Sequence, residues 1–190
     1  MEKEDKILYD LPEIPKNSRL AKYLDELPNA IEEKRLIPFM KNAFQECFRF
    51  ICLNEYVPMF PHTIAVKFIP TTNQFFKELE EQLKNSIQKE EPKKPELTSA
   101  FVKSNTIHID LERQIQILRE YGGLSFVMDL VDIYVHEICH LAYPRKSEQE
   151  IFEMQCSFLE DFLGIKLPEK RKKFKISDYY ESKKQEKQPL

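Results

Sequence analysis

Three residues in the second half of the chain, His136, Glu137 and His140, have the types and spacing of a metal-dependent hydrolase. Together they form the motif H-E-x-x-H. On a helix, the two histidines lie one turn apart on the same face, so both rings can reach one zinc ion. Glu137 stands beside them, where its carboxylate can take a proton from metal-bound water. The motif therefore predicts one zinc ion per chain, with His136 and His140 as ligands and Glu137 as general base.

The residues around the motif are apolar, which predicts a buried helix. Val131, Ile133 and Val135 precede the motif, Ile138 lies within it, and Leu141 follows it. Two histidines and a glutamate in one buried turn are costly unless a partner compensates them. A metal ion provides such a partner. The alternative interpretation is a hydrogen-bonded cluster in the core.

A third protein ligand is expected on the helix that follows. Catalytic zinc sites have three protein ligands and leave the fourth position for water. Pro144 ends the first helix, and Ser147 with Glu150 forms an S-x-x-E capping box that starts a second one. At about 100° per residue, Glu148 points along the apolar stripe of this helix, whereas Glu150 and Glu153 point toward solvent. We expect Glu148 to be the third ligand, with Glu153 as the second candidate. The alternative role for Glu148 is that of a first-turn acid favoured by the helix dipole.

Two further acids could orient a ligand histidine. Asp129 and Asp132 lie one to two turns before His136 on nearly the same face of the helix. Ligand histidines usually donate their second ring nitrogen to a carboxylate or a carbonyl, so either acid could accept this bond. Solvent exposure or helix capping explains the two acids equally well.

This arrangement resembles the active site of the zincin metallopeptidases, and in particular the glutamate-liganded gluzincins and the compact minigluzincins. The core H-E-I-C-H-L is also similar to that of small SprT-like zinc proteases. The resemblance covers roughly residues 97–165 and is strong over 135–153. It implies hydrolysis of peptide bonds, with His136 and His140 as ligands and Glu137 as general base. SprT-like proteases have a ligand histidine at the head of the next helix, where this chain has Glu148, eight residues after His140.

The segments before the motif predict a small sheet. Residues 98–103 and 106–110 flank Ser104-Asn105 and predict a hairpin, and the β-branched segment 63–69 predicts another strand. In zincin-like folds an edge strand just before the active-site helix forms the rim of the cleft. The resemblance therefore makes 106–110 the strand to which a peptide substrate would add.

Helices are expected over 29–56, 72–89 and 111–121, with Pro38 able to kink or split the first and Gly122-Gly123 breaking the chain before the active-site helix. Residues 1–26 are expected to wrap the surface, and 90–96 to form a loop. The predicted fold is α+β and zincin-like: mostly helical, with a small antiparallel sheet above the active-site helix and a following glutamate helix. Core candidates in the first helix are Ile31, Ile37, Phe44, Phe48 and Ile51.

Length and composition fit a single domain. A chain of 190 residues, 42% of them hydrophobic, can bury one core, which we place in residues 1–165. No apolar run approaches the ~20 residues of a membrane span, and the charged N-terminus leads into no signal-peptide core. Four cysteines in apolar contexts indicate reduced core thiols. These features predict a cytoplasmic protein that does not act on membranes.

Residues 166–190 form a basic tail. They hold nine Lys or Arg against four Asp or Glu, a net charge of +5, which leaves −8 for the rest of a chain whose total is −3. A segment this polar is usually flexible. Its aromatic residues could nevertheless dock on the acidic body, on a partner or on nucleic acid.

The function expected from these residues is that of a zinc-dependent metallopeptidase, a hydrolase that cleaves peptide or protein substrates with a water activated by zinc and Glu137. One alternative is a zincin-shaped regulatory or binding protein with little turnover. Another is a DNA-associated SprT-like protease that uses the tail as its nucleic-acid anchor.

Overall fold

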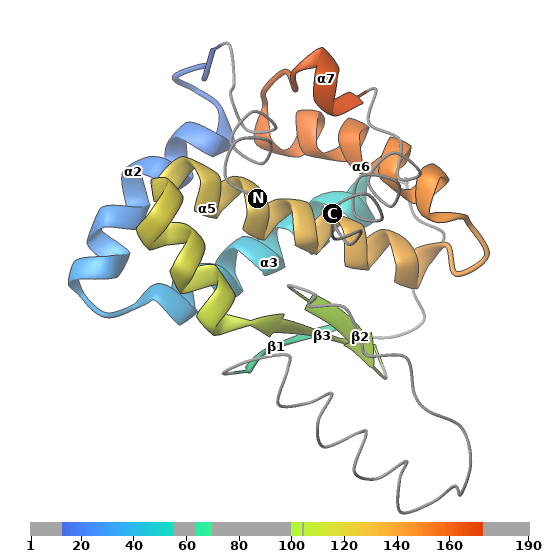
Figure 1. Ribbon diagram of the computed structural model, residues 1–190. Coiled ribbons are helices and arrows are strands. Elements are labelled where there is room, and N and C mark those ends of the chain that lie inside the picture. The colour runs from blue at the N-terminus through green and yellow to red at the C-terminus, as the bar shows by residue number, and fades with distance from the viewer. Residues whose placement is uncertain (1–12, 55–63, 70–99, 104, 173–190) are drawn as a thin grey trace, which may run out of the picture.

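The computed structural model describes residues 13–54, 64–69, 100–103 and 105–172. Within them, helices surround one long central helix, and a three-stranded sheet lies against one side of it (Figure 1). The predicted α+β class, mostly helical with a small sheet, is therefore confirmed. None of the helices in these ranges is both long enough and apolar enough to cross a membrane. The expected helix at 72–89 and loop at 90–96 lie outside the described residues.

The N-terminal part of the described chain consists of two helices, α2 (Arg19–Glu32) and α3 (Leu36–Leu53). The prediction of one helix over 29–56 is wrong, because the chain reverses between them at Lys34, whose φ is 56°. Pro38 does not cause this break. It lies in the first turn of α3, where a backbone N–H has no partner within the helix and its loss costs little.

This break changes which residues reach the core. Ile31 and Ile37, expected to be buried, are 46% and 39% exposed because they flank the turn. Phe44 and Ile51 are buried as expected, and Phe48 packs at the margin. Residues 19–26 do not wrap the surface, because they belong to α2. The side chains that α2 buries are Leu20, Tyr23 and Leu27.

The sheet contains β1 (Ala65–Ile69), β2 (Ala100–Lys103) and β3 (Thr106–Asp110), in the order β1-β3-β2. The hairpin of β2 and β3 is confirmed, but β1 pairs with β3 in parallel, so the sheet is mixed and not antiparallel. The parallel pair is possible because a long segment of chain separates the two strands.

The position of β3 contradicts the role expected for it. Both of its edges are paired, one with β1 and the other with β2, and Ile107 and Ile109 are fully buried. A peptide can add only to a strand with a free edge, so residues 106–110 are not the strand to which a substrate would add. The sequence does not reveal this, because β1 comes from a distant segment.

The central helix α5 (Leu111–Ala142) contains the expected break. Gly122 has φ 83° and ψ −179°, a conformation that side chains disfavour, and it separates the helix into two parts. Asp110 caps the first part by accepting a hydrogen bond from the Arg113 N–H at 2.9 Å. The second part is fully buried along one side, through Phe126, Leu130, Val131, Tyr134, Val135 and Ile138.

Two helices complete the fold, α6 (Glu148–Leu163) and the short α7 (Glu169–Lys172). In Figure 1 the sheet lies below the second part of α5, and α6 lies above it. The segment expected to begin a separate tail at residue 166 starts by packing on this body, with Leu167 and Arg171 each 4% exposed. Cys47, Cys139 and Cys156 are buried free thiols, whereas Cys52 is exposed.

Candidate metal centre

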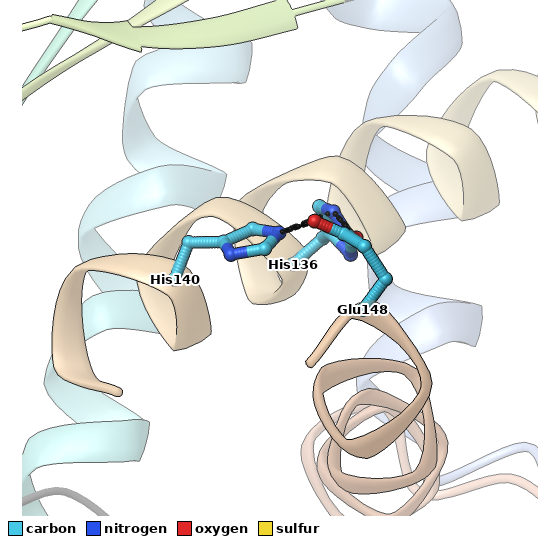
Figure 2. Close-up of side chains that lie close together, drawn as sticks. All are labelled: His136, His140 and Glu148. Atoms are coloured by element: carbon cyan, nitrogen blue, oxygen red, sulfur yellow. Dashed lines mark hydrogen bonds and ion pairs between the residues drawn. The ribbon is translucent and has the colours of Figure 1, made fainter. Parts of the chain in front are cut away.

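Two adjacent helices bring His136, His140 and Glu148 together. Figure 2 shows the two imidazole rings on α5 directed toward the carboxylate at the start of α6. The Nε2 atoms of the histidines are 3.0 Å apart. The Glu148 oxygens lie 3.2 Å from Nε2 of His140 and 3.6 Å from Nε2 of His136. These three residues form a group whose ligand atoms could hold a metal ion.

The turn between the helices explains why Glu148 reaches the histidines. Helix α5 ends at Ala142, just before Pro144, as expected. Ser147 then caps α6, and the predicted capping box with Glu150 is confirmed: Glu150 accepts from the Ser147 N–H at 2.9 Å. Because the box starts the helix here, Glu148 is its first residue and lies beside the end of α5.

The other two acids on α6 are directed elsewhere. Glu150 is held in the capping box, and Glu153 accepts a hydrogen bond from Gln149 at 3.3 Å. Of the three candidates weighed from the sequence, the structure brings Glu148 to the histidines. Its side chain is 55% exposed, however, where the helical phase predicted burial. His136 and His140 are 27% and 28% exposed, so the group is open to solvent on one side.

The distances within the group fit a zinc ion. Tetrahedral zinc with ligand bonds of about 2.0–2.1 Å keeps its ligand atoms about 3.3 Å apart. The two Nε2 atoms are 3.0 Å apart, and each lies 3.2 or 3.6 Å from a different oxygen of Glu148, so the three residues approach one another on this scale. The donor set, two imidazole nitrogens and one carboxylate, is also one that catalytic zinc uses.

Gln155 on α6 orients the first histidine. Its Oε1 is 3.0 Å from Nδ1 of His136, and its Nε2 donates to the carbonyl of Asp132 at 3.1 Å and to the Asp132 carboxylate. Because Asp132 offers only acceptors, the amide nitrogen must face Asp132 and the oxygen must face His136. His136 therefore donates from Nδ1 and presents the lone pair of Nε2 to the group.

This contact modifies the expectation for the two upstream acids. Asp132 supports His136 through Gln155 and not directly, and Asp129 accepts from Nε2 of Gln114 at 2.7 Å. Sequence reasoning missed Gln155. Its signal was a single amide on the apolar stripe of α6, two turns after Glu148, and it is 4% exposed.

Electrostatics keep the site suited to base chemistry. Burial lowers the pKa of His136, against the opposing effect of the Gln155 hydrogen bond, so the ring is neutral near pH 7 and can donate its lone pair. Burial, together with the nearby negative charge of Glu148, raises the pKa of Glu137 to about 7. A carboxyl group with a pKa near the working pH is well matched to general-base catalysis.

Comparisons with family models, with curated proteins and with solved structures found no match to this chain. The resemblance to zincins therefore stays a prediction.

Proposed function

We propose that this protein is a zinc-dependent metallopeptidase. The observation that supports this function best is the convergence of the His136 and His140 Nε2 atoms on the Glu148 carboxylate, with their closest approaches between 3.0 and 3.6 Å. Two imidazoles and a carboxylate would hold one Zn²⁺ at this point. Zinc bound there would supply a Lewis acid that polarises the scissile carbonyl and lowers the pKa of a coordinated water.

The residues of the chain would supply the general base and the access for the substrate. Glu137 follows the first ligand in the sequence, and its raised pKa lets it accept a proton from the attacking water and return it to the leaving amine. The exposed side of Glu148 leaves a direction from which a peptide can approach.

The test combines metal analysis with cleavage of an unfolded protein such as casein. The purified chain should contain about one zinc, lose cleavage when a chelator removes it, and regain cleavage when zinc is added back. Glu137→Gln should keep zinc but lose at least ~100-fold in turnover, because an amide cannot accept the proton. Glu153→Gln, an exposed acid on the neighbouring helix, is the matched control and should cleave normally.

The outcomes separate the proposal from its alternative. If Glu137→Gln cleaves as fast as the wild type, the mechanism is wrong. If the wild type holds zinc but cleaves neither peptides nor unfolded proteins, the alternative is favoured, a regulatory or binding protein that keeps the metal and has little turnover. If no metal binds at all, both interpretations fail.

Nucleic-acid binding through residues 166–190 stays a prediction, which no contact of the described part of this segment, residues 166–172, favours. Two of its cations are engaged within the described part of the chain. Arg171 is paired with Asp132, and Nζ of Lys172 lies 2.7 Å from Glu160. These two side chains stabilise the body of the protein and are unsuited to contact phosphates.

A further inference from the structure

Arg171 on α7 is a buried cation that the proposed mechanism does not yet use. Its side chain is 5% exposed, and its Nη2 lies 3.0 Å from both carboxylate oxygens of Asp132. The guanidinium carbon lies 3.9 Å from the centre of the Phe152 ring, and Nη1 is 3.5 Å from Sγ of Cys156. A cation is rarely buried unless it is paired in this way, so Asp132 is the reason that α7 can carry its arginine inward.

The segment that brings Arg171 to this place is fixed to α6 at a second point. Glu160 accepts from the Leu167 N–H at 2.8 Å and pairs with Lys172. Leu167 is buried, and Pro168 starts the turn by accepting backbone bonds from Arg171 and Lys172. The short helix is therefore held on both sides of Arg171, and its guanidinium has a defined position.

A continuous series of hydrogen bonds connects α7 with His136 of the candidate metal centre. Arg171 pairs with Asp132, Asp132 accepts from Gln155, and Oε1 of Gln155 is 3.0 Å from Nδ1 of His136. Each link determines the next one. The arginine holds the carboxylate, the carboxylate and the backbone carbonyl of Asp132 together select which end of the amide faces them, and the amide oxygen selects which nitrogen of the ring carries the proton.

We infer that Arg171 is a positioning residue for the metal centre: through Asp132 and Gln155 it holds His136 in the Nδ1–H tautomer, with the Nε2 lone pair directed at His140 and Glu148. The inference deepens the proposed function and rests on it for the role of the metal. The C-terminal segment after α6 is thereby part of the site, although it contributes no ligand.

Loss of the arginine has a specific consequence. Without it, the Asp132 carboxylate, whose side chain is 15% exposed, is left without its cationic partner and is free to turn toward solvent. Gln155 then keeps only the backbone carbonyl of Asp132, 3.1 Å from its Nε2, to favour the wild-type orientation, so its amide is held less firmly and more of the molecules can turn it by half a turn. In that orientation the –NH₂ group faces Nδ1 of His136, which must become an acceptor, and the proton moves to Nε2, where it blocks the metal position.

The decisive experiment observes the tautomer in metal-free protein. Long-range ¹H–¹⁵N spectra of the histidine rings distinguish Nδ1–H from Nε2–H, and the four histidines can be assigned by substitution. At a pH where the rings are neutral, wild-type His136 should be the Nδ1–H form. Arg171→Met should shift it toward Nε2–H. Lys166→Met is the matched control, since this cation of the same segment is 82% exposed and should change nothing.

Zinc affinity gives the second measurement. Arg171→Met and Gln155→Met should each weaken zinc binding by about 10- to 100-fold, the usual effect of removing an outer contact of a ligand histidine. The double variant should bind zinc no more weakly than the weaker-binding of the two single variants, because both substitutions interrupt the same series of contacts. Additive losses, or a normal tautomer in folded Arg171→Met, would overturn the inference.

The two readouts keep this inference separate from the proposed function. If Arg171→Met does not fold, Gln155→Met decides, because it leaves the arginine pair intact: an unchanged His136 tautomer would overturn the inference, and a shifted one would support its last link, from Gln155 to His136. Suppose that the wild type binds no zinc but that the His136 tautomer still changes in Arg171→Met. This result would support the positioning role of Arg171 and refute the proposed metallopeptidase.

Discussion

Glu148→Gln is the substitution that separates the charge of the third ligand from its shape. The amide keeps the size of the side chain and one carbonyl oxygen, but it loses the negative charge that faces His136 and His140. The residue is the first of α6, where an acid gains only about 0.3–1 kcal/mol from the helix dipole. The variant should therefore fold, and any large effect should appear in metal binding.

The size of the effect follows from the exposure of the group. A carboxylate oxygen about 2 Å from a dication interacts with it by about 4 kcal/mol at the dielectric constant of water, and by more in a less polar environment. Because the Glu148 side chain is 55% exposed, the water-like value is appropriate. A loss of about 4 kcal/mol corresponds to a ~10³-fold larger dissociation constant for zinc.

The assay is competition for zinc with a coloured chelator of known affinity, using protein whose helical content is verified by circular dichroism. Glu153→Gln is the matched control, because Glu153 lies on the same helix, is exposed, and is held by Gln149 and not by the histidines. The control should bind zinc like the wild type. Affinity of Glu148→Gln within tenfold of the wild type, or an equal loss in Glu153→Gln, would show that Glu148 is not a ligand.

Three further outcomes are expected. Wild-type protein should carry about one zinc per chain, and His140→Ala none after gentle purification; equal metal contents in elemental analysis would contradict the site. Gly164→Ala should cost about 1 kcal/mol, because Gly164 ends α6 with φ 69°, and calorimetry should show a melting point lower by about 2–4 °C; an unchanged value would refute the strain. Burial raises the pKa of Glu46, but hydrogen bonds from Tyr23 and Lys22 outweigh it and lower the pKa overall. The lowered pKa means that ionised Glu46 stabilises the folded state above its unfolded pKa, and that this stabilisation is lost as pH falls through the folded pKa. The free energy of unfolding in urea should therefore fall less steeply at acid pH in Glu46→Gln than in the wild type. Parallel pH profiles of the two proteins would argue against this role of Glu46.

The features that the sequence predicted well are those set by neighbours along the chain. The capping box of Ser147 and Glu150, the end of α5 before Pro144 and the break at Gly122 all depend on a few consecutive residues. The approach of Glu148 to the histidines was also predicted, and the short turn before α6 explains it, whereas the burial that helical phase predicted for this side chain is wrong. Local geometry of this kind leaves the chain few alternatives.

Local sequence signals did not locate the break between α2 and α3. The run of helix formers over 29–56 concealed the reversal at Lys34, because no glycine marks it and Pro38 is the more obvious breaker. The error then placed Ile31 and Ile37 in the core, since helical phase carried across a break is meaningless.

What only the tertiary structure decided is the pairing of segments that lie far apart in the sequence. The parallel pair of β1 and β3 makes the expected edge strand a central one, and nothing within residues 106–110 indicates it. Gln155 and Arg171 are likewise ordinary in sequence, an amide on a helix and a cation in a basic segment. They became partners of Asp132 and His136 because packing of α6 and α7 on α5 buries polar groups that must then find hydrogen bonds, and the available partners are known only once the helices are in place.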